Sequence, residues 1–135
     1  MLRRRTALGK LETLIMDTLW ESKEGVSGKD VHAKVLEQRH VALTTVLTVL
    51  ERLQKKGLVL KLKDEGKALR FAPSVLKEAF YRELSRQALK GLLEESKQGT
   101  LSAFADLLGL LTPEEKAELL RLVEQSKGAD DALEG

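Results

Sequence analysis

A short stretch of the chain, residues 43–57, places hydroxyl and cationic side chains at a spacing that could recognise DNA. At about 100° per residue in a helix, Thr44, Thr48 and Lys55 gather on one side, with Thr45 and Arg52 at its edge. Threonine can bond base edges or phosphates and offer its methyl to thymine, while arginine and lysine can bond guanine or neutralise phosphate. The pattern fits a helix in a DNA major groove, and it also fits a face that is only solvated.

The ends of this helix are marked by the residue types around it. Thr44 and Thr45 suit its first turn, where a hydroxyl can accept from a free backbone N–H. Gly57 follows two lysines and suits a C-terminal stop, with cations at the negative end of the helix dipole. The sequence therefore predicts a bounded helix of about three turns.

Two further helices are expected before this one. Apolar residues three and four apart from Leu8 onward predict a first helix that ends near residues 21–22, with Trp20 as a packing anchor. Ser27 is expected to cap a second helix that ends near residues 38–40. The three helices would position the hydroxyl and cationic face.

A β-hairpin is expected after Gly57. Apolar and basic residues partly alternate over residues 58–63, turn residues occupy 64–67, and an extended stretch returns before Pro73. The hairpin would have a basic tip and basic flanks. Three short helices followed by a two-stranded hairpin predict a mainly α fold of the winged helix-turn-helix class, in which the third helix enters the major groove and the hairpin lies along the DNA backbone.

The remaining residues predict three more helices. Ser74 would cap a long fourth helix that runs to about Ser96, and residues 98–100 would break it. Ser102 would cap a short fifth helix that Gly109 ends.

The sixth helix has the clearest start. Thr112, Pro113 and Glu115 combine an N-cap, a proline at the first helical position and a glutamate placed for a capping box. The polar tail from Lys127 is expected to be frayed. The predicted division is a DNA-binding domain at residues 1–73 and a helical dimerisation domain at residues 74–135.

The C-terminal helices carry leucine stripes but total only about 60 residues, which is near the lower limit for an independent core. We expect the stripes to pack against a second copy, so that a twofold dimer presents two third helices to a palindromic site. The alternative is that these helices fold back on the N-terminal half. The expected dimer interface consists of Leu84, Leu92, Leu93, Phe104, Leu108, Leu119 and Leu122.

Composition excludes several classes of function. The chain has no cysteine, which removes disulfides, thiolate metal sites and cysteine nucleophiles. It has no apolar run of about 20 residues, and its start lacks the apolar core of a signal peptide, so we expect a cytoplasmic protein with no membrane partner. Residues 1–73 hold 15 Lys and Arg against 9 Asp and Glu, whereas residues 74–135 hold 8 against 12. The basic half is the candidate surface for a polyanion.

Catalysis finds no support in the residue pattern. His32 and His40 are eight residues apart and make neither a metal pair at helical spacing nor a general-base arrangement. There is no glycine-rich phosphate loop. The sequence therefore predicts no enzyme, no metal and no cofactor. Two other functions stay open: a winged-helix module that binds protein, which would need an apolar patch on the third helix, and a repressor that responds to a small molecule.

The chain resembles the penicillinase repressor family, of the BlaI and MecI type with the copper-responsive CopY relatives, from about residue 8 to residue 124. The resemblance rests on several segments in order rather than on one diagnostic motif. They are residues 8–12, Met16, residues 19–21, Val31, residues 44–48, Leu50, Arg52, Leu53, residues 56–59 and residues 66–68, with Phe71 and Pro73. It implies a homodimeric winged-helix repressor of palindromic operators, with C-terminal helices intertwined in the dimer.

The resemblance also implies roles for particular residues. The groove-reading residues are Thr44, Thr45, Thr48, Arg52 and Lys55. The phosphate contacts of the hairpin carry over to Lys67 and Arg70, and our reading of charge adds an N-terminal arm of Arg3, Arg4 and Arg5, which could otherwise be only a soluble terminus.

Two departures from the family pattern affect regulation. The copper-responsive relatives use a cysteine cluster near the C-terminus, and this chain has none, which excludes copper sensing by that route. Penicillinase repressors are inactivated by proteolysis at an Asn-Phe bond, and the matching position here is Ala103-Phe104. A sensor protease is thus a further expected partner only if it accepts Ala103 in place of the asparagine.

Overall fold

The computed structural model describes residues 8–63, 66 and 68–134. The chain divides into two compact units, Met1–Gln87 and Ala88–Gly135. Since the boundary lies inside the fourth helix, it differs from the predicted functional division at residue 73. Each unit is described by itself.

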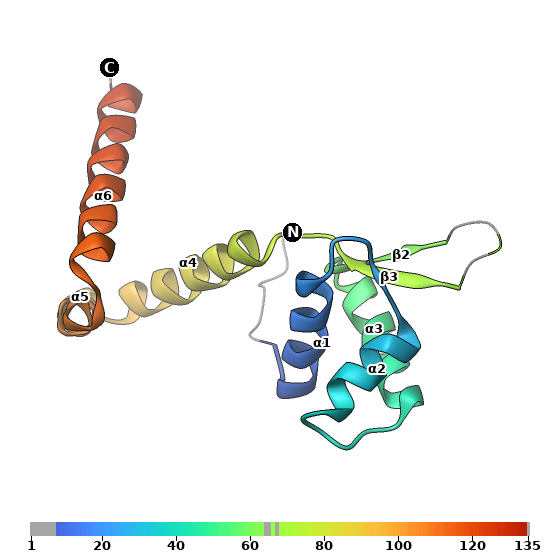
Figure 1. Ribbon diagram of the computed structural model, residues 1–135. Helices are drawn as coiled ribbons and strands as arrows, with labels where there is room; N and C mark the ends of the chain where they lie inside the picture. Colours follow the sequence, from blue (N-terminus) through green and yellow to red (C-terminus); the bar gives the residue numbers. More distant parts are fainter. Residues whose placement is uncertain (1–7, 64–65, 67, 135) are drawn as a thin grey trace. The chain divides into compact units, whose positions relative to one another are not determined.

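The first unit contains three helices, a small sheet and the start of a fourth helix (Figure 1). Its elements in order are α1 (Lys10–Glu21), β1 (Val26–Ser27), α2 (Gly28–Leu36), α3 (Leu43–Lys55), β2 (Val59–Leu62), β3 (Arg70–Pro73) and the beginning of α4 (Lys77–Glu95). All of them contribute to one apolar core except β1, whose Val26 packs at its edge. The core side chains are Ile15, Met16, Leu19, Val31, Val35, Val46, Val49, Leu50, Leu53, Leu58, Val59, Phe71 and Phe80.

The sheet has three strands rather than the expected two. β2 and β3 form the predicted antiparallel hairpin, and β1 pairs with the other edge of β3, which gives the order β1-β3-β2. In the β1–β3 register Val26 lies opposite Phe71. A strand of two residues is too short to show an alternating pattern, so its pairing is decided by the position of β3.

The boundaries of α3 confirm one part of the prediction and correct another. Gly57 has a φ of 82°, and the Leu58 amide donates to the Leu53 carbonyl at 3.0 Å, which is the expected glycine stop. The N-cap residue is Ala42, which makes no side-chain cap. Thr44 and Thr45 therefore do not cap the helix, because the chain is already helical from Leu43.

Trp20 is the packing anchor that the sequence predicts. Its indole N–H donates to the Val75 carbonyl at 2.9 Å, and its ring lies 5.8 Å from that of Phe80. The prediction that Ser74 caps α4 is wrong. The Ser74 amide donates to the Leu58 carbonyl at 2.9 Å and its hydroxyl to the Gly57 carbonyl, so residue 74 is still held beside β2.

The second unit contains the end of α4, α5 (Lys97–Leu107), a 3-10 turn η1 (Leu108–Leu110) and α6 (Pro113–Glu134). The expected break at residues 98–100 is wrong. Ser96 caps α5 by accepting from the Gly99 amide at 3.0 Å, so these residues form the first helical turn and Ser102 lies inside the helix. Gly109 lies within η1 rather than at the end of α5.

The start of α6 agrees with the sequence and its end does not. The Glu115 amide donates to the Thr112 hydroxyl at 3.1 Å, and the Thr112 amide donates to the Glu115 carboxylate at 2.8 Å, which confirms the capping box. The helix continues to Glu134, because the tail from Lys127 contains mostly good helix formers. No helix in the described part of the chain is both long and apolar enough to cross a membrane.

Candidate nucleic-acid interface

Five polar residues of α3 form one exposed surface, called here the α3 face. Val46, Val49, Leu50 and Leu53 are buried in the core on the other side of the helix. This arrangement follows from helical periodicity, since apolar residues three and four apart fix which side of α3 packs inward. The structure thereby exposes all five predicted groove-reading residues on a single element: Thr44, Thr45, Thr48, Arg52 and Lys55.

The hydroxyl of Thr48 is already oriented within the α3 face. Its Oγ1 donates to the Thr44 carbonyl at 2.9 Å, one helical turn earlier. The hydroxyl hydrogen is thus used, and the oxygen retains only acceptor capacity. In a major groove this group suits an amino group on adenine or cytosine better than a guanine oxygen.

An ion pair joins the end of α3 to the start of α1. The Lys56 amine lies 2.9 Å from Glu12 Oε2, and the Gly9 amide donates to Glu12 Oε1 at 3.1 Å. Partial burial raises the pKa of Glu12, but the Lys56 hydrogen bond, the Gly9 amide and the charges of Lys56 and Arg52 outweigh it, so the pKa lies below its usual 4.5. Lys56 is therefore occupied, whereas Lys55 makes no ion pair with the described residues.

His32 holds the turn between α2 and α3. Its Nε2 lies 2.7 Å from the Val41 carbonyl, which requires that this nitrogen carry the proton and donate. His40 is exposed in the same turn. No group of three or more His, Asp or Glu side chains that could hold a metal ion occurs among the described residues.

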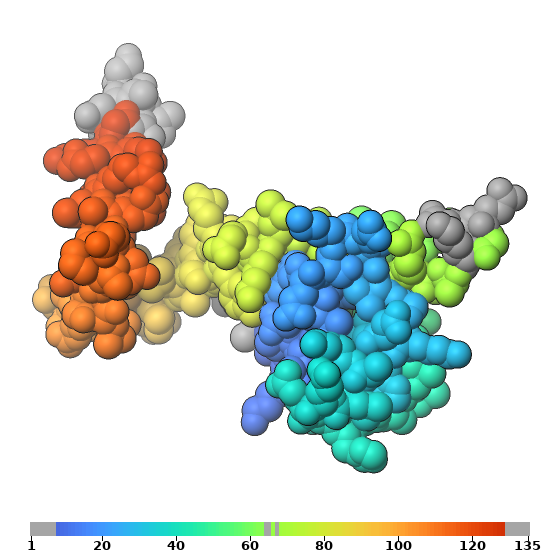
Figure 2. Space-filling model, viewed as in Figure 1, coloured from blue at the N-terminus to red at the C-terminus, as the bar shows by residue number. Residues whose placement is uncertain are grey.

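The hairpin of β2 and β3 stands out from the helical body of the first unit (Figure 2). The predicted contacts at Lys67, Arg3, Arg4 and Arg5 lie outside the described residues. Arg70 is half-buried, and its Nη1 donates to the Glu24 carbonyl at 2.6 Å. This bond ties β3 to the loop before β1, so a phosphate contact by Arg70 has to coexist with a structural one.

Two exposed cations of the hairpin, Lys61 and Lys63, are not among the contact residues predicted from the sequence. The alternation of leucine and lysine over residues 60–63 is the signal that could have identified them. Lys61 pairs across the ladder with Phe71. Cross-strand partners point to the same face of a sheet, so the Lys61 side chain extends from the face on which Phe71 packs into the core.

The difference in net charge is larger between the two units than between the two predicted domains. Residues 1–87 hold 18 Lys and Arg against 11 Asp and Glu, a net charge of +7, and residues 88–135 hold 5 against 10, a net charge of −5. A unit with this excess of cations attracts a polyanion, and salt screens the attraction. The α3 face and the hairpin both belong to the basic unit.

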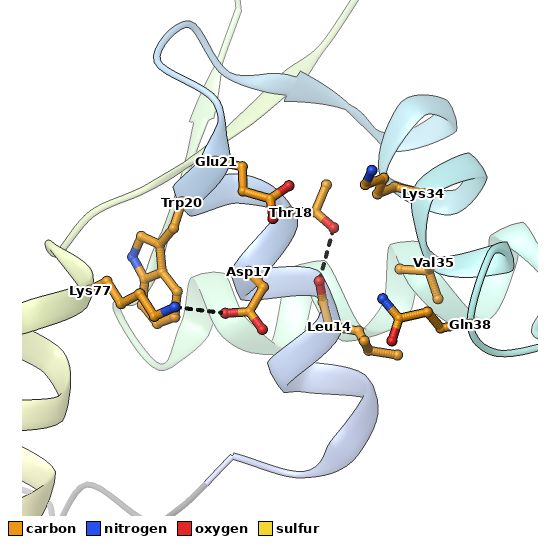
Figure 3. Close-up of a pocket in the computed structure, with 9 residues that line it drawn as sticks. All are labelled: Leu14, Asp17, Thr18, Trp20, Glu21, Lys34, Val35, Gln38 and Lys77. Carbon is orange, nitrogen blue, oxygen red and sulfur yellow. Dashed lines mark hydrogen bonds and ion pairs between the residues drawn. The ribbon is translucent and has the colours of Figure 1, made fainter.

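A groove of about 400 Å³ lies between α1, α2 and the first turn of α4, all in the first unit (Figure 3). Lys77 reaches from α4 to within 3.7 Å of Asp17, while Lys34 borders the groove from α2 and Gln38 from the turn that follows it. None of the α3 face residues lines it. The lining residues are Leu14, Asp17, Thr18, Trp20, Glu21, Lys34, Val35, Gln38 and Lys77.

The second unit exposes most of its large apolar side chains over residues 88–128. None of its side chains over residues 88–128 is buried. Among the predicted interface residues, Leu92, Phe104 and Leu122 are exposed, and Leu84 (in the first unit), Leu93, Leu108 and Leu119 are half-buried. Other exposed apolar residues in this unit are Leu89, Leu101, Leu107, Leu110, Leu120 and Val123.

Three helices and a β-hairpin, with a short strand before α2 completing the sheet, define a winged helix-turn-helix protein. The family model for the penicillinase repressor matches residues 8–125. The chain belongs to the penicillinase repressor family, as its resemblance had suggested.

Similar proteins include the transcriptional regulator BlaI of Mycobacterium tuberculosis, from strains CDC 1551 and H37Rv. Each is 38% identical over 105 residues, which are 77% of this chain and 75% of the relative. Among solved structures, the regulator Tm0710 of Thermotoga maritima is similar over 92% of this chain and 77% of that one, at 13% identity and a TM-score of 0.48. The PcaV regulator of Streptomyces coelicolor is similar over 91% and 77%, at 18% identity and a TM-score of 0.47.

Proposed function

We propose that this protein is a transcriptional repressor that binds a palindromic operator as a homodimer. Family membership and the winged-helix fold support the coarser statement, a DNA-binding transcriptional regulator. The observation that carries the finer one is the α3 face, a solvated row of hydroxyls and cations on a helix whose opposite side is fully packed. Such a helix offers base-edge and phosphate contacts without moving any core residue.

The roles within the α3 face follow from side-chain chemistry. Thr45, Thr48 and Arg52 contact base edges, with the Thr48 oxygen accepting from an amino group and Arg52 donating to guanine. Lys55 neutralises a phosphate, as do Lys61 and Lys63 of the hairpin, because a flexible ammonium in open solvent binds as a point charge.

A second copy of the chain accounts for the exposed apolar surface of the second unit. Large apolar side chains exposed along three helices cost solubility unless another surface covers them. A twofold interface covers both copies with the same residues, and it leaves two α3 helices for one palindromic site. Half-sites are then separated by about one turn of DNA, roughly 34 Å, or a multiple of it.

Selection of bound sequences from a random duplex pool tests this function directly. The expected result is an inverted repeat, bound with an affinity that falls steeply with salt. Binding to all sequences alike would contradict the sequence-specific reading and favour the protein-interaction module. A selected site without twofold symmetry would contradict the dimer.

Release of the repressor by a sensor protease is proposed at Ala103-Phe104. This bond lies inside α5, and the Phe104 side chain is exposed. Proteases bind extended backbone, so α5 has to unwind locally before cleavage. Mass spectrometry of protein recovered from cells under inducing conditions tests the site, and intact protein released from its operator would contradict it.

The groove between α1, α2 and α4 favours a second candidate, a repressor that responds to a small molecule. Its volume is in the range of small-ligand sites, and its lining combines apolar side chains with two carboxylates and two amines. A screen of metabolites for thermal stabilisation, repeated with Lys34→Ala, tests this candidate. Ligands that stabilise both proteins equally would place binding elsewhere.

A further inference from the structure

Leu47 is an apolar residue on a side of α3 that is otherwise polar. Its side chain is 36% exposed, and the other exposed positions of this helix carry only polar side chains: Thr44, Thr45, Thr48, Glu51, Arg52, Gln54 and Lys55. In a helix Leu47 lies roughly 60° around the axis from Thr44 and roughly 100° from Thr48. Leu47 also lies roughly 60° from the buried Leu50, so it occupies the border between the α3 face and the buried side of the helix.

The Leu47 side chain is seated against the start of α2. A Cβ atom added to Gly28 would lie only 2.6 Å from Leu47 Cδ2. The second-nearest atom, Cε2 of the Phe71 ring, would lie 3.8 Å from that Cβ. Gly28 is buried and is the first residue of α2. Because residue 28 has no side chain, one methyl of Leu47 fits closely over its backbone, and Leu47 as a whole remains 36% exposed.

We infer that Leu47 reads the methyl group of a thymine in each operator half-site. This inference rests on the proposed function, since it requires α3 in the major groove. A helix docked there removes water from Leu47 as well as from its polar neighbours. Among the groups in the major groove the thymine C5-methyl is the apolar one, so it is the contact that offsets the loss of water around a leucine.

The contact would discriminate thymine from cytosine at one position of each half-site. Thymine and cytosine both place their distinguishing group at the same edge of the groove, but cytosine lacks the methyl and presents an amino donor. A leucine has no acceptor for that donor and leaves it without a partner. Leu47 is thus a specificity-determining residue whose effect falls on one base pair per half-site.

Replacing thymine by uracil in the selected operator tests the inference, because it removes only the C5-methyl. Each thymine is replaced in turn, symmetrically in both half-sites, and affinity is measured with the wild-type protein and with Leu47→Ala. One position is expected to lose about 5- to 20-fold in affinity with the wild-type protein when both methyls are absent. With Leu47→Ala the same replacement is expected to change affinity less than about 2-fold.

A matched control is Thr45→Ser, which removes a methyl from the other edge of the α3 face and is expected to keep the full uracil penalty at the Leu47 position. A second variant, Gly28→Ala, forces the Leu47 side chain to shift and is expected to reduce the penalty while leaving the fold intact by circular dichroism.

The outcomes separate this inference from the proposed function. Operator binding that is insensitive to every thymine methyl, or a penalty that is equal in wild type and Leu47→Ala, would overturn the role of Leu47 and leave the repressor intact. Failure of the wild-type protein to select any operator would overturn the proposed function, and this inference with it. The uracil experiment with wild-type protein needs no variant. It can therefore overturn the role of Leu47 even if the Leu47→Ala protein folds poorly.

Discussion

The two units of this protein use their apolar side chains in opposite ways. Between residues 15 and 80 thirteen apolar side chains are buried, and they come from α1, α2, α3, the β2–β3 hairpin and the start of α4. Over residues 88–128 no side chain is buried, although α5, η1 and α6 are as regular as the helices of the first unit. Regular secondary structure therefore does not by itself indicate a complete core. The first unit holds its own core, whereas the side chains of the second unit over residues 88–128 all remain at least partly exposed.

The largest expected effect comes from truncating the core of the first unit. Leu50→Ala removes a side chain that is 0% exposed, and the free energy of unfolding should fall by about 2–5 kcal/mol because a cavity remains. Urea denaturation followed by circular dichroism measures it. Leu110→Ala is the matched control in the second unit, because that leucine is 79% exposed. Equal losses for the two variants would contradict the contrast between the units.

Introducing charge into the second unit should separate the copies. Leu92→Glu or Leu122→Glu places a carboxylate in the proposed interface, and sedimentation velocity should show monomers with operator affinity reduced more than about 10-fold.

The control for this experiment is Leu36→Glu, in the first unit. Leu36 is 42% exposed and Leu122 is 49% exposed, so the two substitutions differ in unit and hardly in local burial. The Leu36→Glu protein should remain a dimer. If both Leu92→Glu and Leu122→Glu also sediment as dimers, the interface lies elsewhere.

Within the α3 face, base contacts and phosphate contacts should respond differently. Arg52→Ala should change sequence preference and cost about 1–3 kcal/mol of binding free energy at one base pair. Lys55→Ala should weaken binding to all sequences and lower the slope of log affinity against log salt by about one unit. Both are measured by titration over a salt series.

Lys116→Ala in the acidic unit serves as the control for charge loss and should leave the salt slope unchanged. An Arg52→Ala protein with the affinity and sequence preference of wild type would show that the proposed orientation of α3 in the groove is wrong.

The smallest effect concerns the ion pair between α1 and α3. Because the folded pKa of Glu12 is below 4.5, its contribution to stability is present above about pH 4.5 and is lost as the pH falls through the folded pKa. Glu12→Gln should cost about 0.5–1 kcal/mol at neutral pH and flatten the dependence of the melting temperature on pH below 5.

Glu118→Gln in α6 is the comparison for that variant. Glu118 pairs with Arg121 within the same helix, and its side chain is more exposed than that of Glu12, so its loss should shift the melting temperature less than the loss of Glu12. A larger shift for Glu118 would mean that the α1–α3 link contributes little to the first unit.

Much of this arrangement was predictable because it depends on neighbours in the sequence. The polar side of α3, the stop at Gly57, the hairpin and the Thr112 capping box each follow from residues within about one or two turns of each other. The errors have a similar explanation. Ser96 and Ser102 are both acceptable caps by local pattern, and the observed choice keeps residues 97–107 in one uninterrupted helix.

By itself the sequence determined the helices, their buried sides, the basic and acidic halves and the family. Local periodicity, capping chemistry and charge contain that information. Tertiary structure alone decided which distant groups meet: β1 joins β3, Arg70 is bonded to the carbonyl of Glu24, and Leu47 is seated over Gly28. These contacts depend on the core of the first unit, because the packing of its apolar side chains sets the distances between groups that are far apart in the sequence.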